Sequence, residues 1–264
     1  NNRDHRKITV IDGNIAYTGG LNLSDEYINK KIKYGYWKDN AIKLQGNSVW
    51  NLTIMFLSLW NSYKKEDKDY LKFKTTDNLK IKPNGYLSAY ASVPINGVLE
   101  GEDVYLNIIN KATKYVYIIT PYLIIDTDMI NSIILAFKRG VDVRIVIPGI
   151  PDKKIVYDLT MSYVKNLVDA GIKVYTYTPG FIHSKIFVSD DNKATVGTIN
   201  LDYRSLYLHF ENGVYLEDVK EIEDILNDVN NILTESHLLT KKETNYNIFR
   251  KVWQSILRFF ATLF

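Results

Sequence analysis

One pattern of five residues occurs twice in this chain of 264 residues, and it constrains the fold more than any other feature. Each copy has a histidine, a lysine two residues later, an aspartate five beyond the lysine, a glycine seven further on and an asparagine three after the glycine. The first copy consists of His5, Lys7, Asp12, Gly19 and Asn22, and the second of His183, Lys185, Asp190, Gly197 and Asn200. A repeat that keeps all its internal spacings predicts two related halves that together build one site.

Each copy has the sequence of a β-hairpin. Residues 7–11 would pair with 15–18, and residues 185–189 with 194–196, across turns that begin at the motif aspartates. Because residues i and i+2 of a strand lie on one face, the histidine and lysine of each copy should project together. Asp12 and Asp190 are candidate catalytic residues, but a carboxylate that opens a turn accepts hydrogen bonds from backbone amides, so we favour a structural role.

The rest of the chain predicts an α/β fold. Helical patterns alternate with short apolar strands in the second half, which favours a sheet covered on both faces. The expected helices are 101–113, 127–139, 155–170 and 218–233, and the expected strands between and after them are 115–119, 142–147, 173–177 and 212–216. The first half retains its hairpin, a strand near residue 41 and a helix over 48–63, so we expect it to be incomplete.

These patterns divide the chain into four parts. We expect the remainder of a first half at 1–63, a lysine- and aspartate-rich connector at 64–92, a complete second half at 93–240 and a helix at 241–264. The chain opens almost directly on the first motif, which suggests the C-terminal part of something longer.

Composition excludes several classes of protein. With 46% hydrophobic and 24% charged residues the chain is typical of a globular domain, and the absence of cysteine excludes disulfides and thiolate chemistry. A net charge of only +3 argues against nucleic acid as a partner. No apolar run is long enough to predict a membrane-spanning helix, and no signal-peptide pattern is present.

The doubled motif suits the chemistry of a phosphodiester. If the halves face each other, two imidazoles, two ammonium groups and the carboxamides of Asn22 and Asn200 surround one point. Lysine and asparagine donors would stabilise the non-bridging oxygens, while one histidine attacks phosphorus and the other protonates the leaving alcohol. We expect no cofactor and no metal, because the protein supplies the positive charge itself and shows no ligand spacing. The other histidines, His209 and His237, are more simply read as packing or surface residues.

At these residues the chain resembles the phospholipase D superfamily, whose mark is the doubled His-x-Lys-x4-Asp motif, and within it the bacterial cardiolipin synthases. The stretches that carry the resemblance include HRKITVIDGNIAYTGGLNLSDEY, GYWKDNAIKLQG, KRGVDVRIVIPGIPDKK, AGIKVYTYTPGFIHSKIFVSDD and GTINLDYRSLYLHFENGVYL. The resemblance implies an α/β/α sandwich of two pseudo-symmetric halves. Family members carry N-terminal membrane helices and a first-half segment before the first motif, so this chain resembles an N-terminally truncated member with an open sheet edge.

The resemblance also implies a reaction. One phosphatidylglycerol would give its phosphatidyl group to an enzyme histidine with release of glycerol, and a second would attack the phosphohistidine to form cardiolipin. His5 would be the nucleophile and His183 the acid and then the base, although pseudo-symmetry allows the reverse. Glu211 matches a family position near the histidines and could orient an imidazole; the alternative is a surface carboxylate at a strand end. The expected catalytic residues are His5, Lys7, Asp12, His183, Lys185 and Asp190, and the expected substrate-binding residues are Gly20, Asn22, Thr198, Asn200 and Glu211.

The C-terminal residues 244–264 contain no acidic side chain and carry an apolar stripe rich in phenylalanine. This pattern predicts an amphipathic helix in a membrane interface; the alternative is a helix docked on the protein's own core or at a dimer contact. The expected partners are therefore anionic phospholipid and a membrane surface, at the bacterial cytoplasmic membrane. Two other functions stay open: a hydrolase with water as the acceptor, and a truncated, inactive lipid-binding fragment. The sequence does not determine the oligomeric state.

Overall fold

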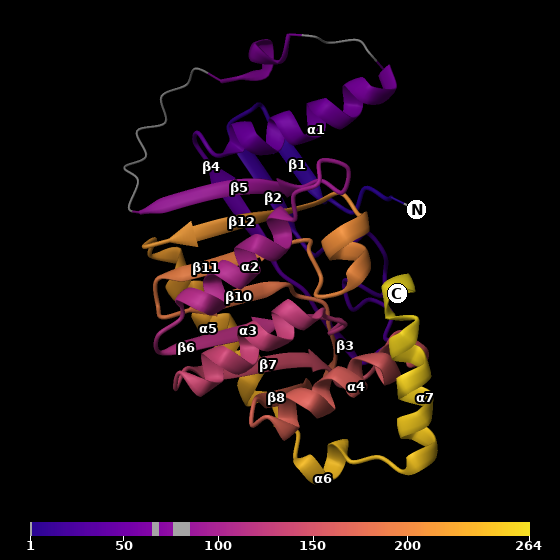
Figure 1. The fold of residues 1–264 in the computed structure, drawn as a ribbon. Coiled ribbons are helices and arrows are strands. Elements are labelled where there is room, and N and C mark those ends of the chain that lie inside the picture. Colours follow the sequence, from indigo (N-terminus) through magenta and orange to yellow (C-terminus); the bar gives the residue numbers. More distant parts are fainter. Residues whose placement is uncertain (1, 65–68, 76–84) are drawn as a thin grey trace.

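The computed structural model of the chain describes residues 2–64, 69–75 and 85–264. An eight-stranded sheet forms its centre, in the order β13-β8-β7-β6-β10-β11-β12-β5 (Figure 1). The strands in that order are β13 (Ser236–Leu238), β8 (Lys173–Tyr177), β7 (Asp142–Pro148), β6 (Tyr115–Ile119), β10 (Ile186–Ser189), β11 (Lys193–Gly197), β12 (Glu211–Glu217) and β5 (Tyr86–Ser92). The neighbours β6, β7 and β8 are parallel, and all other pairs in this sheet are antiparallel.

Helices cover one face of this sheet. Figure 1 shows α2 (Glu100–Lys111), α3 (Thr127–Lys138) and α4 (Lys154–Asp169) in front of the strands. Parallel strands need crossover connections, which α3 supplies between β6 and β7 and α4 between β7 and β8. Asp126 begins α3 by accepting a hydrogen bond from the N–H of Met129. The predicted α/β fold is confirmed, with these helices and strands close to the expected bounds.

The other face carries a second layer from the first half. A three-stranded sheet, β1 (Ile8–Ile11), β2 (Ile15–Gly19) and β4 (Ala41–Gln45), shares one apolar core with the large sheet, with α1 (Val49–Lys64) and with α5 (Glu221–Thr234). Its order and antiparallel pairing repeat those of β10, β11 and β12. Over the described residues, β10 also pairs with β6, whereas no strand pairs with the outer edge of β1. The two halves are therefore related, and the first is the smaller.

A third, two-stranded sheet joins the halves directly. β3 (Tyr36–Lys38) from the first half runs parallel to β9 (Gly180–Ile182) from the second, immediately before His183. Neither strand was predicted, because each is only three residues long and exists through its long-range partner. Sequence periodicity carries no signal for such a strand.

The expected connector over 64–92 is wrong at its C-terminal end. Tyr86–Ser92 forms the edge strand β5, which pairs along its whole length with β12. Its small and polar residues weaken the alternation that identifies a strand. A short 3₁₀ helix, η1 (Tyr70–Phe73), lies earlier in the connector, and residues 65–68 and 76–84 lie outside the described part of the chain.

The chain ends in three short elements. These are α6 (Lys241–Thr244), α7 (Ile248–Phe259) and the 3₁₀ turn η3 (Ala261–Leu263). The expected C-terminal helix is thus present as α7, which packs against α4 through Gln254 and Leu257. None of the helices in the described ranges is both long and apolar enough to cross a membrane.

Candidate active site

The two motif histidines lie where the halves meet, each held by the opposite half. The backbone N–H of His5 donates to the carbonyl of Phe210 over 2.9 Å, and that of His183 donates to the carbonyl of Lys38 over 2.7 Å. Phe210 and Lys38 each precede an acidic residue, Glu211 and Asp39. The same backbone contact is therefore made twice, with the halves exchanged.

Each imidazole is paired with the carboxylate that follows this contact. His5 Nδ1 lies 2.9 and 3.0 Å from the two carboxylate oxygens of Glu211, and His183 Nδ1 lies 2.7 Å from Asp39 Oδ2. Because a carboxylate can only accept, each Nδ1–H donates, which leaves the lone pair of Nε2 free for chemistry. Glu211 was predicted near the histidines. Asp39 was missed, because it stands 34 residues after His5 whereas Glu211 stands 28 after His183; the asparagine that follows each acid is the signal that could have identified it.

Two predicted site residues, Thr198 and Gly20, lie next to these carboxylates. Glu211 is fully buried and accepts hydrogen bonds from Thr198 Oγ1 and, over 2.7 Å, from Ser205 Oγ. Gly20 lies at the position of Thr198 in the first half, where an added Cβ would come within 2.2 Å of Asp39 Oδ1. The observed contacts of Thr198 and Gly20 are thus with the two acids, and contact with substrate stays a prediction for both.

The motif lysines lie beside the histidines, Lys185 buried and Lys7 half-buried. Lys185 is 1% exposed and donates from Nζ to the carbonyl of His183, as Lys7 does to the carbonyl of His5 over 2.7 Å. Burial lowers the pKa of Lys185 to about 7 and that of Lys7 to about 8, and the charges of Asp39 and Glu211 oppose this only in part. The site therefore concentrates positive charge that an anion would stabilise.

The electrostatics of His183 follow from the same burial. Burial, and then the charge of Lys185, lower the pKa of His183 to about 4 against the effect of Asp39. Burial opposes ionisation of Asp39, but the hydrogen bond from His183 and the charge of Lys185 outweigh it, so its pKa is lowered. At neutral pH the pair is a neutral imidazole on an ionised carboxylate.

The two motif aspartates lie outside this site. Asp190 accepts hydrogen bonds from the backbone N–H groups of Thr113, Lys114 and Tyr115 and from the Thr113 hydroxyl, at 2.7–3.0 Å. It stands five residues beyond Lys185 along a strand, about 16 Å away. Asp12 is exposed in the turn between β1 and β2 with φ +50°. Asp190 therefore anchors the start of β6, which suits the structural role favoured for it, and a catalytic role for Asp12 and Asp190 stays a prediction.

The motif asparagines differ in environment. Asn200 is 7% exposed, and its Oδ1 has no hydrogen-bond partner within the described residues. Ser184 Oγ, between the second motif's histidine and lysine, is buried and in the same condition. Buried polar atoms without partners are unusual in native proteins, and a ligand bound beside them would supply the missing partners. Asn22 is half-buried just after Gly20.

Aromatic side chains form one wall of the site. The ring of Trp37 stacks on Phe181 with centroids 4.6 Å apart and lies 5.0 Å from the imidazole of His183. The ring of Tyr27 packs against Trp37 with centroids 4.4 Å apart. Sequence reasoning missed this wall, because its members come from both halves.

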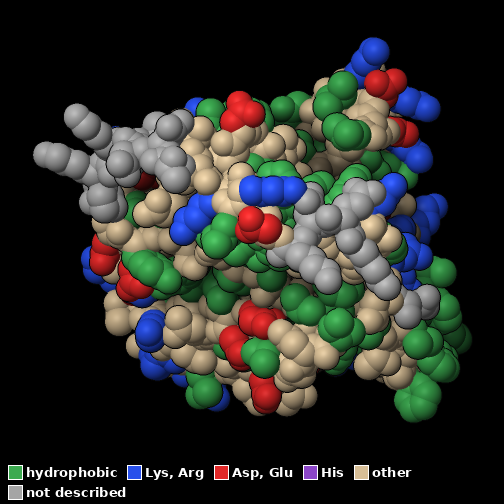
Figure 2. Space-filling view, turned by 90° about the horizontal axis from the view of Figure 1, so that it is seen from above, with side chains coloured by type: hydrophobic (Ala, Val, Ile, Leu, Met, Phe, Trp, Pro, Cys, Tyr) green, Lys and Arg blue, Asp and Glu red, His purple; other side chains and the backbone are tan. Residues whose placement is uncertain are grey.

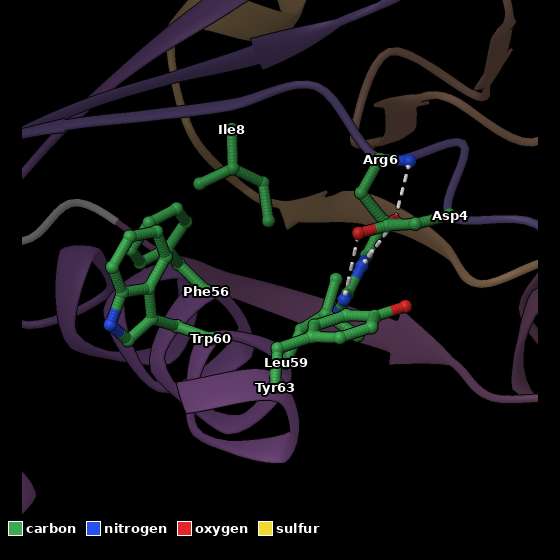
Figure 3. Close-up of a pocket in the computed structure, with 7 residues that line it drawn as sticks. All are labelled: Asp4, Arg6, Ile8, Phe56, Leu59, Trp60 and Tyr63. Atoms are coloured by element: carbon green, nitrogen blue, oxygen red, sulfur yellow. Dashed lines mark hydrogen bonds and ion pairs between the residues drawn. The ribbon is translucent and has the colours of Figure 1, made fainter. Parts of the chain in front are cut away.

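A separate pocket of about 250 Å³ opens between the N-terminal segment and α1. Figure 3 shows aromatic side chains of α1 on one side and the ion pair of Arg6 with Asp4 on the other. Its lining contains neither motif histidine: Asp4, Arg6, Ile8, Phe56, Leu59, Trp60 and Tyr63. We therefore place the chemistry at the histidines, where the titratable groups converge. Over the ranges that the structure describes, no cluster of three or more histidine or acidic side chains could hold a metal ion.

Comparison with known proteins gives the context for this geometry. The family described as cardiolipin synthase, PLD-like domain, matches residues 105–233. A cardiolipin synthase from Halalkalibacterium halodurans is 37% identical over 228 residues, covering 86% of this chain and 45% of that protein. Cardiolipin synthase 1 of Staphylococcus aureus (strain COL) is 39% identical over 244 residues, covering 92% and 49%. An uncharacterized protein of Streptococcus mutans is 48% identical over 241 residues, covering 91% and 52%.

The chain thus spans about half the length of the relatives that it matches. Among solved structures, a phosphatidylserine synthase of Haemophilus influenzae has a similar fold, with a TM-score of 0.70 and 18% identity over 98% of this chain and 69% of that one. That likeness confirms the fold that the resemblance implies.

Proposed function

Because this chain belongs to the phospholipase D superfamily, we propose that it carries the phosphatidyl-transfer site of a cardiolipin synthase. One observation carries the proposal: each motif histidine is paired at Nδ1 with a carboxylate of the opposite half, beside the buried Lys185 and the half-buried Lys7. The proposed substrate is phosphatidylglycerol, and the proposed location is the surface of a bacterial cytoplasmic membrane. We propose residues 1–63 as one half of the site and a second half that begins at β5.

In the first step His5 is the nucleophile. Its side chain is 27% exposed against 8% for His183, so a substrate phosphorus reaches it more readily. With Nδ1–H donating to Glu211, the Nε2 lone pair of His5 attacks phosphorus. A P–N bond forms as the P–O bond to glycerol breaks, and the leaving oxygen takes a proton from His183.

His183 acquires that proton together with the substrate. In the free protein it is neutral, partly because of the neighbouring Lys185 charge. An anionic phosphodiester placed against Lys185 and Lys7 offsets this charge and raises the pKa of His183. The acid is therefore formed when the substrate binds.

In the second step His183 acts as the base. It removes the proton from a hydroxyl of a second phosphatidylglycerol, whose oxygen attacks phosphorus and displaces His5 Nε2. Lys7 and Lys185 stabilise the charge on the non-bridging oxygens in both steps, and Asn22 and Asn200 are the proposed further donors. With water as the acceptor, the same residues would give phosphatidic acid.

The test uses vesicles that contain phosphatidylglycerol labelled in its acyl chains. These vesicles are incubated with two proteins: the chain itself and a longer version that reaches the length of its relatives. The His5→Ala and His183→Ala variants of each protein are tested in the same way. Cardiolipin and glycerol that disappear in both variants support the transferase, and phosphatidic acid as the main product supports the hydrolase. A lack of any product from the longer version would refute the proposal. Acid quenching followed by peptide mass spectrometry should find the phosphatidyl group on His5.

A further inference from the structure

The C-terminal helix α7 docks on the protein with its polar face. Arg250 forms an ion pair with Asp158 of α4 at 2.6 Å. Gln254 is buried and donates to the carbonyl of Asp158, and Arg258 donates to Ser162 Oγ over 3.0 Å. An amphipathic helix of a globular protein normally buries its apolar stripe, so this orientation is inverted.

The apolar stripe of α7 and the turn after it consequently faces solvent. Phe249 and Phe259 are 84% and 82% exposed. The remaining large hydrophobic side chains on this face are also exposed: Ile248, Val252, Trp253, Ile256, Phe260 and Leu263. A continuous exposed stripe of this kind marks a contact with a membrane or with another protein.

A second exposed apolar element lies in the segment that links β2 to β3, residues 21–35, called here the 21–35 loop. Leu23, Ile28 and Ile32 project into solvent, and Leu23 is fully exposed. Exposed lysines lie between and beside them, at positions 30, 31 and 33. The loop also holds Asp25 and Glu26, of which Asp25 lies 3.9 Å from Lys30.

Both elements are attached to the walls of the active site. Asn29 of the loop donates to the carbonyl of Trp37 over 2.9 Å, and Trp37 lies against His183. At the other end, Arg204 donates to the carbonyl of Leu263 over 3.0 Å, just beyond α7. The residue after Arg204 is Ser205, which holds Glu211, the partner of His5. The loop therefore flanks the site on the His183 side and α7 on the His5 side.

The two elements also share one edge of the molecule. The loop ends at Gly35, which lies against Ile150 just after the carboxyl end of β7. Figure 1 shows the arrowheads of β7 and β8, β3 and α7 at this same edge, on the right of the view. Figure 2 keeps this edge on the right and shows hydrophobic side chains projecting from it. The two protruding apolar elements that flank the site therefore lie at one edge of the molecule.

We propose that α7 and the 21–35 loop together form the surface by which the protein docks on an anionic lipid leaflet, with the active site facing the headgroups. The inference rests on the proposed function, since it assigns the lipid surface to the same site. Charge complementarity favours a leaflet over a second copy of the chain. No acidic residue occurs over 244–264, and three lysines surround the apolar tips of the loop. Apolar side chains at the acyl boundary with lysines at the phosphates are the features of interfacial membrane binding.

The experiment measures co-sedimentation with vesicles in the His5→Ala background, so that binding is scored without turnover. Vesicles contain phosphatidylcholine alone or with phosphatidylglycerol. The double variant Phe249→Asp/Phe259→Asp should lower partitioning by at least about tenfold on both vesicles. The triple variant Lys30→Gln/Lys31→Gln/Lys33→Gln should remove only the preference for phosphatidylglycerol. The matched control is Leu135→Asp, which also replaces an exposed apolar side chain with aspartate, but on α3. This variant should bind vesicles like the parent.

Two results would overturn the docking surface. One is vesicle binding by the phenylalanine double variant that equals the parent's. The other is a dimer in sedimentation velocity without lipid that the same variant abolishes, because α7 would then contact a second copy. Turnover of short-chain phosphatidylglycerol dissolved as monomers is measured separately, with an intact His5. If the longer protein does not turn over this monomeric substrate but still binds vesicles, the result counts against the proposed function. The docking surface is then still supported.

Discussion

Lys185 is a fully buried cation of the site, and its replacement by methionine should stabilise the fold while abolishing transfer. Burial lowers its pKa from 10.5 to about 7. At about 1.4 kcal/mol per pKa unit, this shift corresponds to a cost of about 5 kcal/mol for holding the lysine there at neutral pH. Methionine has a similar length and no charge, but it gives up the hydrogen bond to the carbonyl of His183 and leaves Asp39 less compensated, at a cost of about 1–3 kcal/mol. We expect a net gain of about 3 kcal/mol in the free energy of unfolding.

The pH dependence of this gain has a definite sign. Since the pKa of Lys185 is lower in the folded than in the unfolded state, the unfolded state binds more protons between about pH 7 and pH 10.5. The destabilisation caused by burying the charged Lys185 is complete below pH 7 and decreases as pH rises through this window. The advantage of Lys185→Met should therefore be largest near neutral pH and close to zero, or reversed, above about pH 10.5.

Urea unfolding followed by tryptophan fluorescence, at about pH 6 and about pH 10, measures this difference. Lys138→Met, on the exposed side of α3, is the control and should change stability by less than about 0.5 kcal/mol at both pH values. A Lys185→Met variant that is less stable than the parent at neutral pH would refute the reasoning. A gain that does not change with pH would refute it as well, because the stabilisation would then not come from removing a charge.

Four further predictions follow from the site. Asp39→Asn should lower kcat by at least about 100-fold with little change in KM, in steady-state assays on phosphatidylglycerol, because His183 loses the carboxylate that orients it; an unchanged kcat would exclude a positioning role. Gly20→Ala should lower kcat similarly, since its Cβ would lie 2.2 Å from Asp39 Oδ1, and an unshifted carboxylate in a crystal structure would contradict this. Asp190→Ala removes four hydrogen bonds at the start of β6 and should destabilise the protein by about 2–4 kcal/mol in urea. The pKa of His183, about 4 in the free protein, should rise when dimethyl phosphate binds, which NMR titration of its imidazole measures; a constant pKa would argue against substrate-coupled protonation.

The local parts of the site could be predicted from the sequence alone. Strand periodicity placed His183 and Lys185 on one face, and the repeated spacing identified the same pair at His5 and Lys7. The hairpins and the helices of the second half were predicted near their true bounds, because their patterns depend on neighbours within one element. The same local logic identified Asp190 as a turn residue, and the structure has a turn at residues 190–192.

Which groups meet in the site depends on long-range contacts. Asp39 reaches His183 across 144 positions of sequence, and Glu211 reaches His5 across 206, so neither contact leaves a local pattern. Each histidine pairs with an acid of the opposite half because the two related halves pack against each other over one shared core. The helix α7 gives the clearest contrast: its sequence fixed an apolar stripe, but the arginines that bind α4 decided that the stripe points outward. An amphipathic sequence shows that a helix has an apolar and a polar face. The surface against which the helix packs determines which face is buried.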